Sequence, residues 1–233
     1  MKKIALVSLL ALACCTNDVS NDVEQVESVT QASHAWSNYR WGTGGPVSVA
    51  LSRNLTPVWS PFLDVAAVDW SQSLVIDTFV VPGSVNPRTC KPTAGRVEVC
   101  NAKYGKNGWL GIASVWANTT TGRITQATVK LNDSYFETAK YNTPDWRMLV
   151  TCQEVAHTFG LDHQDEDFAN ANLGTCMDYT SNPAGPPANT HPNAHDYEEL
   201  EIIYGGGTLA SESDKTAPGR VVQVITHIFP VVE

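Results

Sequence analysis

The sequence lacks any apolar run long enough to cross a membrane beyond its first 15 residues, and it lacks clusters of lysine or arginine. A membrane-spanning helix needs about 20 predominantly apolar residues, so the only membrane contact that we expect is at the N-terminus. Lys and Arg number 15 against 24 Asp and Glu, which gives a formal net charge of -9. Binding to nucleic acid or to an anionic membrane surface needs clustered positive charge. The sequence therefore predicts neither of these partners.

The sequence also lacks closely spaced cysteine pairs beyond residue 15, and this argues against a zinc ribbon, whose ligands stand two to four residues apart. The cysteines in that part of the chain are Cys90, Cys100, Cys152 and Cys176. An even number of cysteines indicates disulfides if the chain is exported, and three pairings are possible. We expect the two local ones, Cys90 with Cys100 and Cys152 with Cys176.

The N-terminus has the pattern of a secretory signal peptide, in which Lys2 and Lys3 precede an apolar stretch that ends at Ala13. A small residue directly before cysteine at the end of such a stretch resembles the processing site of bacterial lipoproteins. Either Cys14 or Cys15 would then begin the mature protein and carry the lipid. We therefore expect an exported protein that is lipid-anchored at the bacterial cell envelope or, without the lipid, secreted.

Composition divides the chain into a signal peptide at residues 1–15 and three further parts. Residues 16–45 are rich in Asn, Ser, Gln, Glu and Gly, which is typical of a polar tether. Residues 46–205 have the apolar patterning of one folded domain. Residues 206–233 form a tail, in which the apolar run 221–229 could add a strand. We expect the protein to be a monomer.

Apolar patterning within the domain predicts both strands and helices. Between Thr143, which can cap a helix, and Gly160, which can end one, we expect a helix as far as Phe159. The segment 170–190 is rich in Asn, Pro and Gly and is expected to be irregular. The expected strands are 47–51, 74–81, 96–99, 109–116 and 124–132, and the other expected helices are 62–70 and 196–204.

The run QEVAHTFGLDHQD contains the candidate catalytic residues. It matches the long zinc-protease pattern H-E-x-x-H-x-x-G-x-x-H at Glu154, His157, Gly160 and His163, with Gln153 in place of the first histidine. Side chains four residues apart lie on one face of a helix, so residues 153 and 157 can converge on a single ion. Gly160 permits a sharp reversal of the chain, which brings His163 back to the same ion.

The expected metal ligands are therefore Gln153, His157 and His163, with Glu154 beside them. Three protein ligands and a water molecule are typical of a catalytic zinc site, whereas a structural zinc site is closed by four protein ligands. The amide oxygen of glutamine lies as many bonds from Cα as the distal nitrogen of histidine, but it is a poorer zinc ligand. A remaining alternative is that His191 or His195 supplies the missing imidazole.

A second motif, Cys176-Met177-Asp178-Tyr179, follows the third expected ligand. Together, the two motifs resemble those of the metzincin clan of zinc endopeptidases, in particular its matrixin-like members. The resemblance implies that Met177 lies in a turn beneath the metal and that Tyr179 binds the metal or steadies the transition state. A disulfide between Cys152 and Cys176 would join the two halves of the site.

The resemblance covers about residues 47–204 and implies an α+β fold of the metzincin type. This is a twisted mixed sheet of about five strands packed on two helices, followed by an irregular C-terminal subdomain with the methionine turn and a final helix. It also implies that strand 124–132 is the edge along which a peptide substrate lies. The implied function is an exported zinc-dependent endopeptidase with Glu154 as general base and a protein or peptide as substrate. The alternative is a weak or inactive protein of this fold that binds peptides or surface partners.

Overall fold

A computed structural model of the 233-residue chain describes residues 32–205 and 222–232. The expected signal peptide, the lipidation site and the first part of the expected tether lie outside the described residues. In the part that is described, no helix is both long and apolar enough to cross a membrane.

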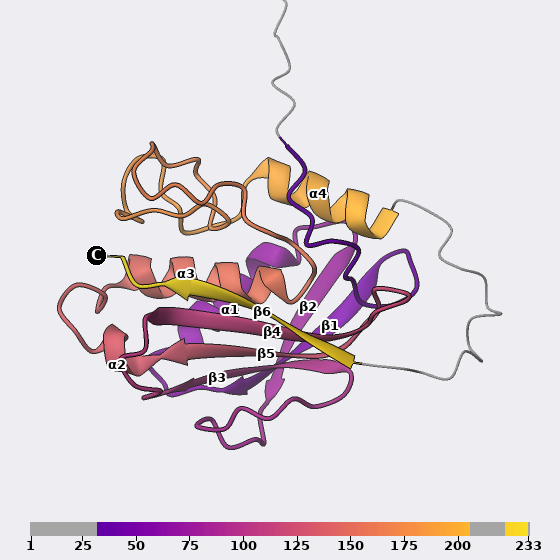
Figure 1. Cartoon of the computed structure of the whole chain (residues 1–233), viewed down its shortest axis with the longest axis horizontal. Helices are drawn as coiled ribbons and strands as arrows, with labels where there is room; N and C mark the ends of the chain where they lie inside the picture. Colours follow the sequence, from indigo (N-terminus) through magenta and orange to yellow (C-terminus); the bar gives the residue numbers. More distant parts are fainter. Residues whose placement is uncertain (1–31, 206–221, 233) are drawn as a thin grey trace, which may run out of the picture. The chain divides into compact units, whose positions relative to one another are not determined.

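A mixed sheet of six strands, in the order β2-β1-β3-β5-β4-β6, forms the centre of the fold (Figure 1). From β2 to β5 along this order, neighbouring strands are parallel. Strand β4 runs antiparallel to both of its neighbours, β5 and β6. The strands are β1 (Val47–Asn54), β2 (Ile76–Pro82), β3 (Arg96–Ala102), β4 (Trp109–Asn118), β5 (Ile124–Asn132) and β6 (Val222–Pro230). The α+β class and the mixed sheet are confirmed, and the apolar run of the tail adds the sixth strand.

Strand β5 is an interior strand, so the expectation that residues 124–132 form the edge for a substrate is wrong. It pairs with β3 on one side and with β4 on the other. After β3, the chain forms β4 one position farther out in the sheet and then returns as β5, which lies between β3 and β4. The hairpin therefore gives β4 the outer position among the first five strands, and β6 occupies its far side.

Helices α1 (Ser60–Trp70) and α3 (Pro144–His157) lie on the same face of the sheet (Figure 1). The Thr143 side chain caps α3 by accepting a hydrogen bond from the backbone N–H of Trp146, and Pro144 occupies the first turn. Helix α4 (Ala194–Gly205) lies near the expected position. The short α2 (Asp133–Phe136) was not expected, because four residues are too few to show helical periodicity.

Helix α3 is buried on every side. All of its residues from Trp146 to His157 are buried. The sheet covers one side, and the long loop 160–193 with α4 covers the opposite side (Figure 1). The motif residues 153–157 consequently lie inside the molecule, between the sheet and this loop.

The packed unit begins before residue 46, within the segment expected to be a tether. Ala35 forms a bridge with Leu161, and Arg40 forms one with Arg123. Trp41 is 7% exposed, and its Nε1 donates a hydrogen bond to the Thr158 carbonyl oxygen at 2.7 Å. The large apolar area of the Trp41 side chain favours packing over extension into solvent.

Candidate metal centre

His157, at the end of α3, is buried and held in one orientation. Its Nδ1 lies 2.8 Å from the carbonyl oxygen of Leu161. Since a carbonyl oxygen only accepts hydrogen bonds, Nδ1 carries the proton and Nε2 keeps its lone pair. Burial is the main cause that lowers the pKa of His157 well below its usual value, so the neutral, metal-binding form predominates.

A reversal of the chain at Gly160 places His163 beside His157. Gly160 has φ of 98°, and a Cβ there would lie 1.9 Å from the carbonyl oxygen of Tyr39, so the position requires glycine. The two imidazole ring centroids are 4.7 Å apart. Nδ1 of His163 lies 2.9 Å from Glu166 Oε1, and its Nε2 is buried without a hydrogen-bond partner in the described structure. The two histidines lie side by side as expected, and their role as metal ligands stays a prediction.

Glu154 lies one residue along α3 from Gln153 and is fully buried against the sheet. A Cβ added at Gly111 of β4 would lie 2.6 Å from Glu154 Oε1, so only glycine leaves room for this carboxyl group. Neither carboxyl oxygen has a hydrogen-bond partner of good geometry among the described residues. Burial raises the pKa of Glu154 well above its usual value, and the nearby backbone amides of Phe229 and Ala113 oppose this shift only in part.

Gln153 is buried on the turn of α3 before His157. Its Nε2 donates a hydrogen bond to the Cys176 carbonyl oxygen at 2.7 Å. This bond fixes the orientation of the amide and leaves Oε1 buried, without a partner in the described ranges. An unpaired carbonyl oxygen is the atom through which glutamine binds a cation, so metal binding by Gln153 stays a prediction that this orientation permits.

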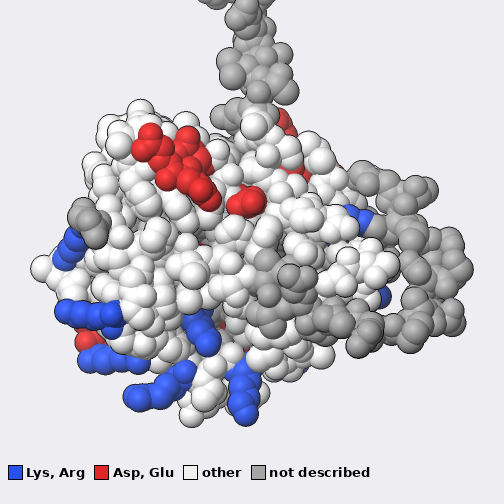
Figure 2. Space-filling model, in the orientation of Figure 1, with Lys and Arg blue, Asp and Glu red and all other residues white. Residues whose placement is uncertain are grey.

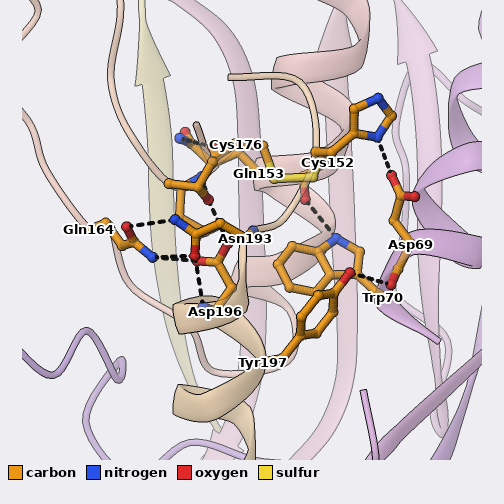
Figure 3. Close-up of a disulfide and its surroundings, with 12 residues drawn as sticks. Asp69, Trp70, Cys152, Gln153, Gln164, Cys176, Asn193, Asp196 and Tyr197 are labelled. Carbon is orange, nitrogen blue, oxygen red and sulfur yellow. Dashed lines mark hydrogen bonds and ion pairs between the residues drawn. A yellow bond between two sulfur atoms is a disulfide. The ribbon is translucent and has the colours of Figure 1, made fainter. Parts of the chain in front are cut away.

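A disulfide between Cys152 and Cys176 joins α3 to the segment that contains Met177 (Figure 3). Its Cα atoms are 6.0 Å apart, and the Nε1 of Trp70 donates a hydrogen bond to the Cys152 carbonyl oxygen at 3.2 Å. The other expected disulfide, Cys90–Cys100, is also formed. Met177 is fully buried on the turn directly after the bond.

Asp196, in the first turn of α4, connects three segments around the site (Figure 3). Its carboxyl group accepts hydrogen bonds from Thr175 Oγ1 at 2.5 Å, from the Asn193 backbone N–H at 2.7 Å and from Gln164 Nε2 at 3.0 Å. Thr175 precedes the disulfide, whereas Gln164 follows His163. A buried carboxyl group bonded in this way fixes the two segments relative to each other.

A third histidine, His227 of β6, joins the pair on α3 and its turn. One nitrogen from each of His157, His163 and His227 can be chosen so that the three atoms lie within 4.8 Å of one another. The rings of His157 and His227 stack with centroids 4.1 Å apart. His227 was missed in the sequence, and the only signal was a histidine inside an apolar run. Its place beside His157 depends on the pairing of β6 with β4.

His191 and His195 lie outside this cluster. His191 Nδ1 bonds to Asp69 Oδ2 at 2.7 Å, and its side chain is 56% exposed. His195 groups instead with His34 and Glu199. The alternative in which one of these two loop histidines supplies the missing imidazole is therefore wrong in this structure, because each is engaged elsewhere.

Tyr179 lies beside the cluster and contacts β6. Its ring centroid is 4.3 Å from that of His163, and its hydroxyl donates a hydrogen bond to the Ile228 carbonyl oxygen at 3.0 Å. Burial is the main cause that raises the pKa of Tyr179, so the hydroxyl keeps its proton and acts as a donor.

The donor set fits a divalent cation of borderline softness such as zinc. Imidazole nitrogen is a common zinc ligand, and ligating histidines usually donate their other N–H to a carbonyl or carboxylate. His157 meets this condition through Leu161, and His163 does so through Glu166. Acidic side chains also gather over the loop that follows α3 (Figure 2), where Asp165, Glu166 and Asp167 stand in succession. Their negative charge favours a cation nearby.

Comparison with solved structures finds distant likenesses. Myroilysin is 11% identical with a TM-score of 0.41, over 74% of this chain and 85% of that one. Archaemetzincin from Archaeoglobus fulgidus is 15% identical with a TM-score of 0.35, over 66% of this chain and 99% of that one. High choriolytic enzyme 1, a hatching enzyme zinc-protease from the medaka Oryzias latipes, is 10% identical with a TM-score of 0.35. The match covers 72% of this chain and 94% of that one. No protein-family model matches the sequence, and no match was found among curated proteins.

Proposed function

We propose that this chain is an exported zinc-dependent endopeptidase of the metzincin clan, with a matrixin-like motif in which Gln153 replaces the first ligand histidine. The observation that carries the proposal is the junction of α3 with the turn after it. Two neutral imidazoles, each with its Nδ1 hydrogen-bonded, lie on the same helix end and turn as a buried carboxyl group whose oxygens make no hydrogen bond of good geometry in the described residues. A satisfied structural core would leave no such group unpaired.

Gln153, His157 and His163 would hold the zinc ion. Zinc bound by three protein ligands lowers the pKa of a water molecule and polarises a substrate carbonyl. A neutral amide in place of a neutral imidazole leaves the charge of such a site unchanged, although it weakens the binding of zinc. The hydrogen bond from Gln153 to Cys176 holds the amide in place on the side of the disulfide.

Glu154 supplies the proton transfers that peptide hydrolysis needs. As general base it accepts a proton from the attacking water, and as general acid it passes this proton to the leaving amine. Tyr179 has a hydroxyl that already donates a hydrogen bond to a peptide carbonyl, that of Ile228. A substrate carbonyl in the same place would receive the same hydrogen bond as negative charge develops on its oxygen.

The substrate is an extended protein or peptide segment, which would add as a strand along β4. The outer side of β4 offers backbone donors and acceptors beside the metal centre, and β6 uses them in this structure. Peptides bind exposed sheet edges in this way. We propose that the enzyme acts as a monomer and has no nucleic-acid partner.

Metal analysis and peptide cleavage by wild type and Glu154→Gln test the proposal. We expect zinc in both proteins and a value of kcat/KM that is lower in the variant by about 100-fold or more, since general acid–base catalysis contributes about 10²- to 10⁴-fold. The control is Glu201→Gln, because Glu201 lies exposed on α4. Zinc-independent cleavage, or equal cleavage by wild type and Glu154→Gln, would contradict the assignment.

A second candidate function is peptide binding without cleavage. The observation in its favour is that β6, a peptide strand of the chain itself, pairs with β4 and contacts Tyr179. This function predicts that a peptide binds and is recovered intact. It also predicts that Glu154→Gln and wild type bind the peptide equally well.

A further inference from the structure

We propose that the C-terminal strand β6 closes the metal centre, with His227 as a third imidazole ligand beside His157 and His163 and with the Ile228–Phe229 peptide in the place of a substrate. The metal is a divalent cation of borderline softness, such as zinc. The part that concerns the substrate rests on the proposed function, whereas the part that concerns the metal rests on the histidine cluster alone.

The three histidines form a cluster that a structural role does not explain. They come from a helix end, a turn and a strand far along the chain, yet one nitrogen of each lies within 4.8 Å of the others. His227 Nε2 is buried and has no hydrogen-bond partner in the described part of the chain, although Asp162 Oδ1 lies 3.5 Å away. His163 Nε2 is unpaired in the same way. Buried ring nitrogens without partners are costly, and a cation held by this cluster would pair them.

The backbone of β6 follows the path of an added peptide strand. It pairs antiparallel with β4 in a register that places His227 opposite Ala113, Ile228 opposite Ile112 and Phe229 opposite Gly111. Gly111 is the residue whose missing Cβ makes room for Glu154. The pairing therefore brings the peptide after Ile228 to the catalytic carboxyl group.

Both expected catalytic side chains face this one peptide group. The Tyr179 hydroxyl donates a hydrogen bond to the carbonyl oxygen of Ile228 at 3.0 Å. On the other side, Phe229 lies opposite Gly111 in the pairing, and the missing Cβ of Gly111 makes room for the Glu154 carboxyl group. A scissile peptide would meet the same two groups, its carbonyl at the tyrosine and its nitrogen at the glutamate.

Aromatic contacts hold β6 in this place. Phe229 is fully buried, and its ring centroid lies 5.1 Å from that of Tyr179 and 6.2 Å from that of Trp146. The ring of Trp36 meets that of His227 edge to face, with centroids 4.0 Å apart. With β6 bound, Glu154 is excluded from solvent and the outer side of β4 is taken. The strand must leave before a substrate can bind.

Zinc affinity, measured by competition with a chelator, tests the ligand. We expect His227→Ala to lower the affinity by about 10- to 100-fold or more, because changes one shell farther from a metal already cost about this much. The matched control is His191→Ala, which should bind zinc as wild type does. Gln153→His in the His227→Ala background should restore the affinity, since it returns a third imidazole. Equal affinity of wild type and His227→Ala would overturn the proposal.

Hydrogen exchange of the full-length protein tests the position of the strand. Zinc should slow the exchange of amides in residues 222–230 of wild type and have no effect on them in His227→Ala. At saturating zinc, His227→Ala should cleave peptides faster than wild type, and a synthetic peptide with the sequence of residues 222–232 should inhibit that cleavage. Unchanged exchange on adding zinc to wild type, or cleavage no faster in the variant, would overturn the role of β6.

These outcomes separate this proposal from the proposed function. If cleavage depends on Glu154 while zinc affinity is indifferent to His227, the function stands and the closure by β6 is wrong. If zinc binding depends on His227 but neither wild type nor His227→Ala cleaves peptides, the metal site stands and the peptidase function is wrong. If no protein in the series binds zinc, both are wrong.

Discussion

The proposed role of Glu154 as general base conflicts with its burial as long as β6 is in place. A general base must be ionised before it can take a proton, yet burial raises the pKa of this carboxyl group well above its usual value. Its side chain lies between α3 and the strands β4 and β6, with no exposed surface. Displacement of β6 would admit water and remove the main cause of the shift. The arrangement with β6 in place therefore favours the protonated carboxyl group.

The pH dependence of stability should reveal this buried carboxyl group. Because the pKa of Glu154 is raised in the folded state, its stabilising effect is fully present below the unfolded pKa of about 4.3 and is lost as pH rises toward the folded value. Glutamine has no proton to lose. We therefore expect Glu154→Gln to gain stability relative to wild type as pH rises above about 4.3, in thermal unfolding of chelator-treated proteins.

The buried histidines make stability change with pH in the opposite direction, and they do so equally in wild type and in Glu154→Gln. The difference between the two stability–pH curves therefore isolates Glu154. Burial lowers the pKa of His163 to about 3, and stability from that residue is lost as pH falls below its unfolded value of about 6.5. Glu201→Gln, on the exposed side of α4, should follow wild type at every pH. Parallel curves for wild type and Glu154→Gln would show that the carboxyl group is not buried in solution.

At the scale of elements, residue patterns in the sequence predicted the helix ends and strand bounds that depend on interactions between neighbouring residues. Thr143 and Pro144 begin α3 and Gly160 turns the chain after it, because a cap, a fixed φ and a positive φ each require a particular residue type. Strand β5 has the predicted bounds of Ile124–Asn132. The motif residues on α3 and its turn converge for the same local reason, with Glu154 next to them on the helix.

Pairing between distant strands was not predictable in this way. The order in which β4 and β5 enter the sheet depends on contacts of the whole core, so the edge strand was misassigned. His227 joins the cluster only because β6 pairs with β4 in one register, and a shift by one residue would turn its side chain to the other face. Nothing in residues 222–230 alone encodes that register.

The Cys152–Cys176 disulfide should affect both stability and the metal centre. Its loop spans 24 residues, and the chain-entropy model gives a loss of roughly 3 to 4 kcal/mol when such a bond is removed. We expect the double variant Cys152→Ala/Cys176→Ala to lose about this much in urea unfolding. We also expect it to bind zinc more weakly, because Gln153 and Met177 directly follow the two cysteines.

The matched control is Cys90→Ala/Cys100→Ala, whose disulfide closes a shorter loop of 10 residues that ends on β3. It should lose a similar but slightly smaller free energy of unfolding, about 3 kcal/mol, and keep the zinc affinity of wild type. A fall in zinc affinity of the same size in both double variants would show that general loosening of the fold is responsible. The bond on α3 would then have no special role in the site.

At the scale of the whole molecule, segments from both ends of the described chain meet at the histidine cluster. Trp36 belongs to the segment before the first strand, and its backbone N–H donates a hydrogen bond to the Gly160 carbonyl oxygen at 2.6 Å. Its ring contacts His227 of β6 and lies 6.1 Å from that of His157. Displacement of β6 would therefore break a contact with the segment before the first strand, which links the state of the centre to that segment.

The anchor itself is a prediction from the sequence, and intact mass after expression in a bacterium that processes lipoproteins tests it. We expect mature protein that begins at Cys14 or Cys15 and carries added acyl mass. If more than one acyl chain is attached, the protein should also partition stably into the membrane fraction. Cys14→Ala and Cys15→Ala form the matched pair, and only the variant that lacks the lipidated residue should appear in the soluble fraction. An unmodified N-terminus in wild type would instead indicate plain secretion. With the anchor present, the protein would lie at the cell envelope, an oxidising environment in which its two disulfides persist.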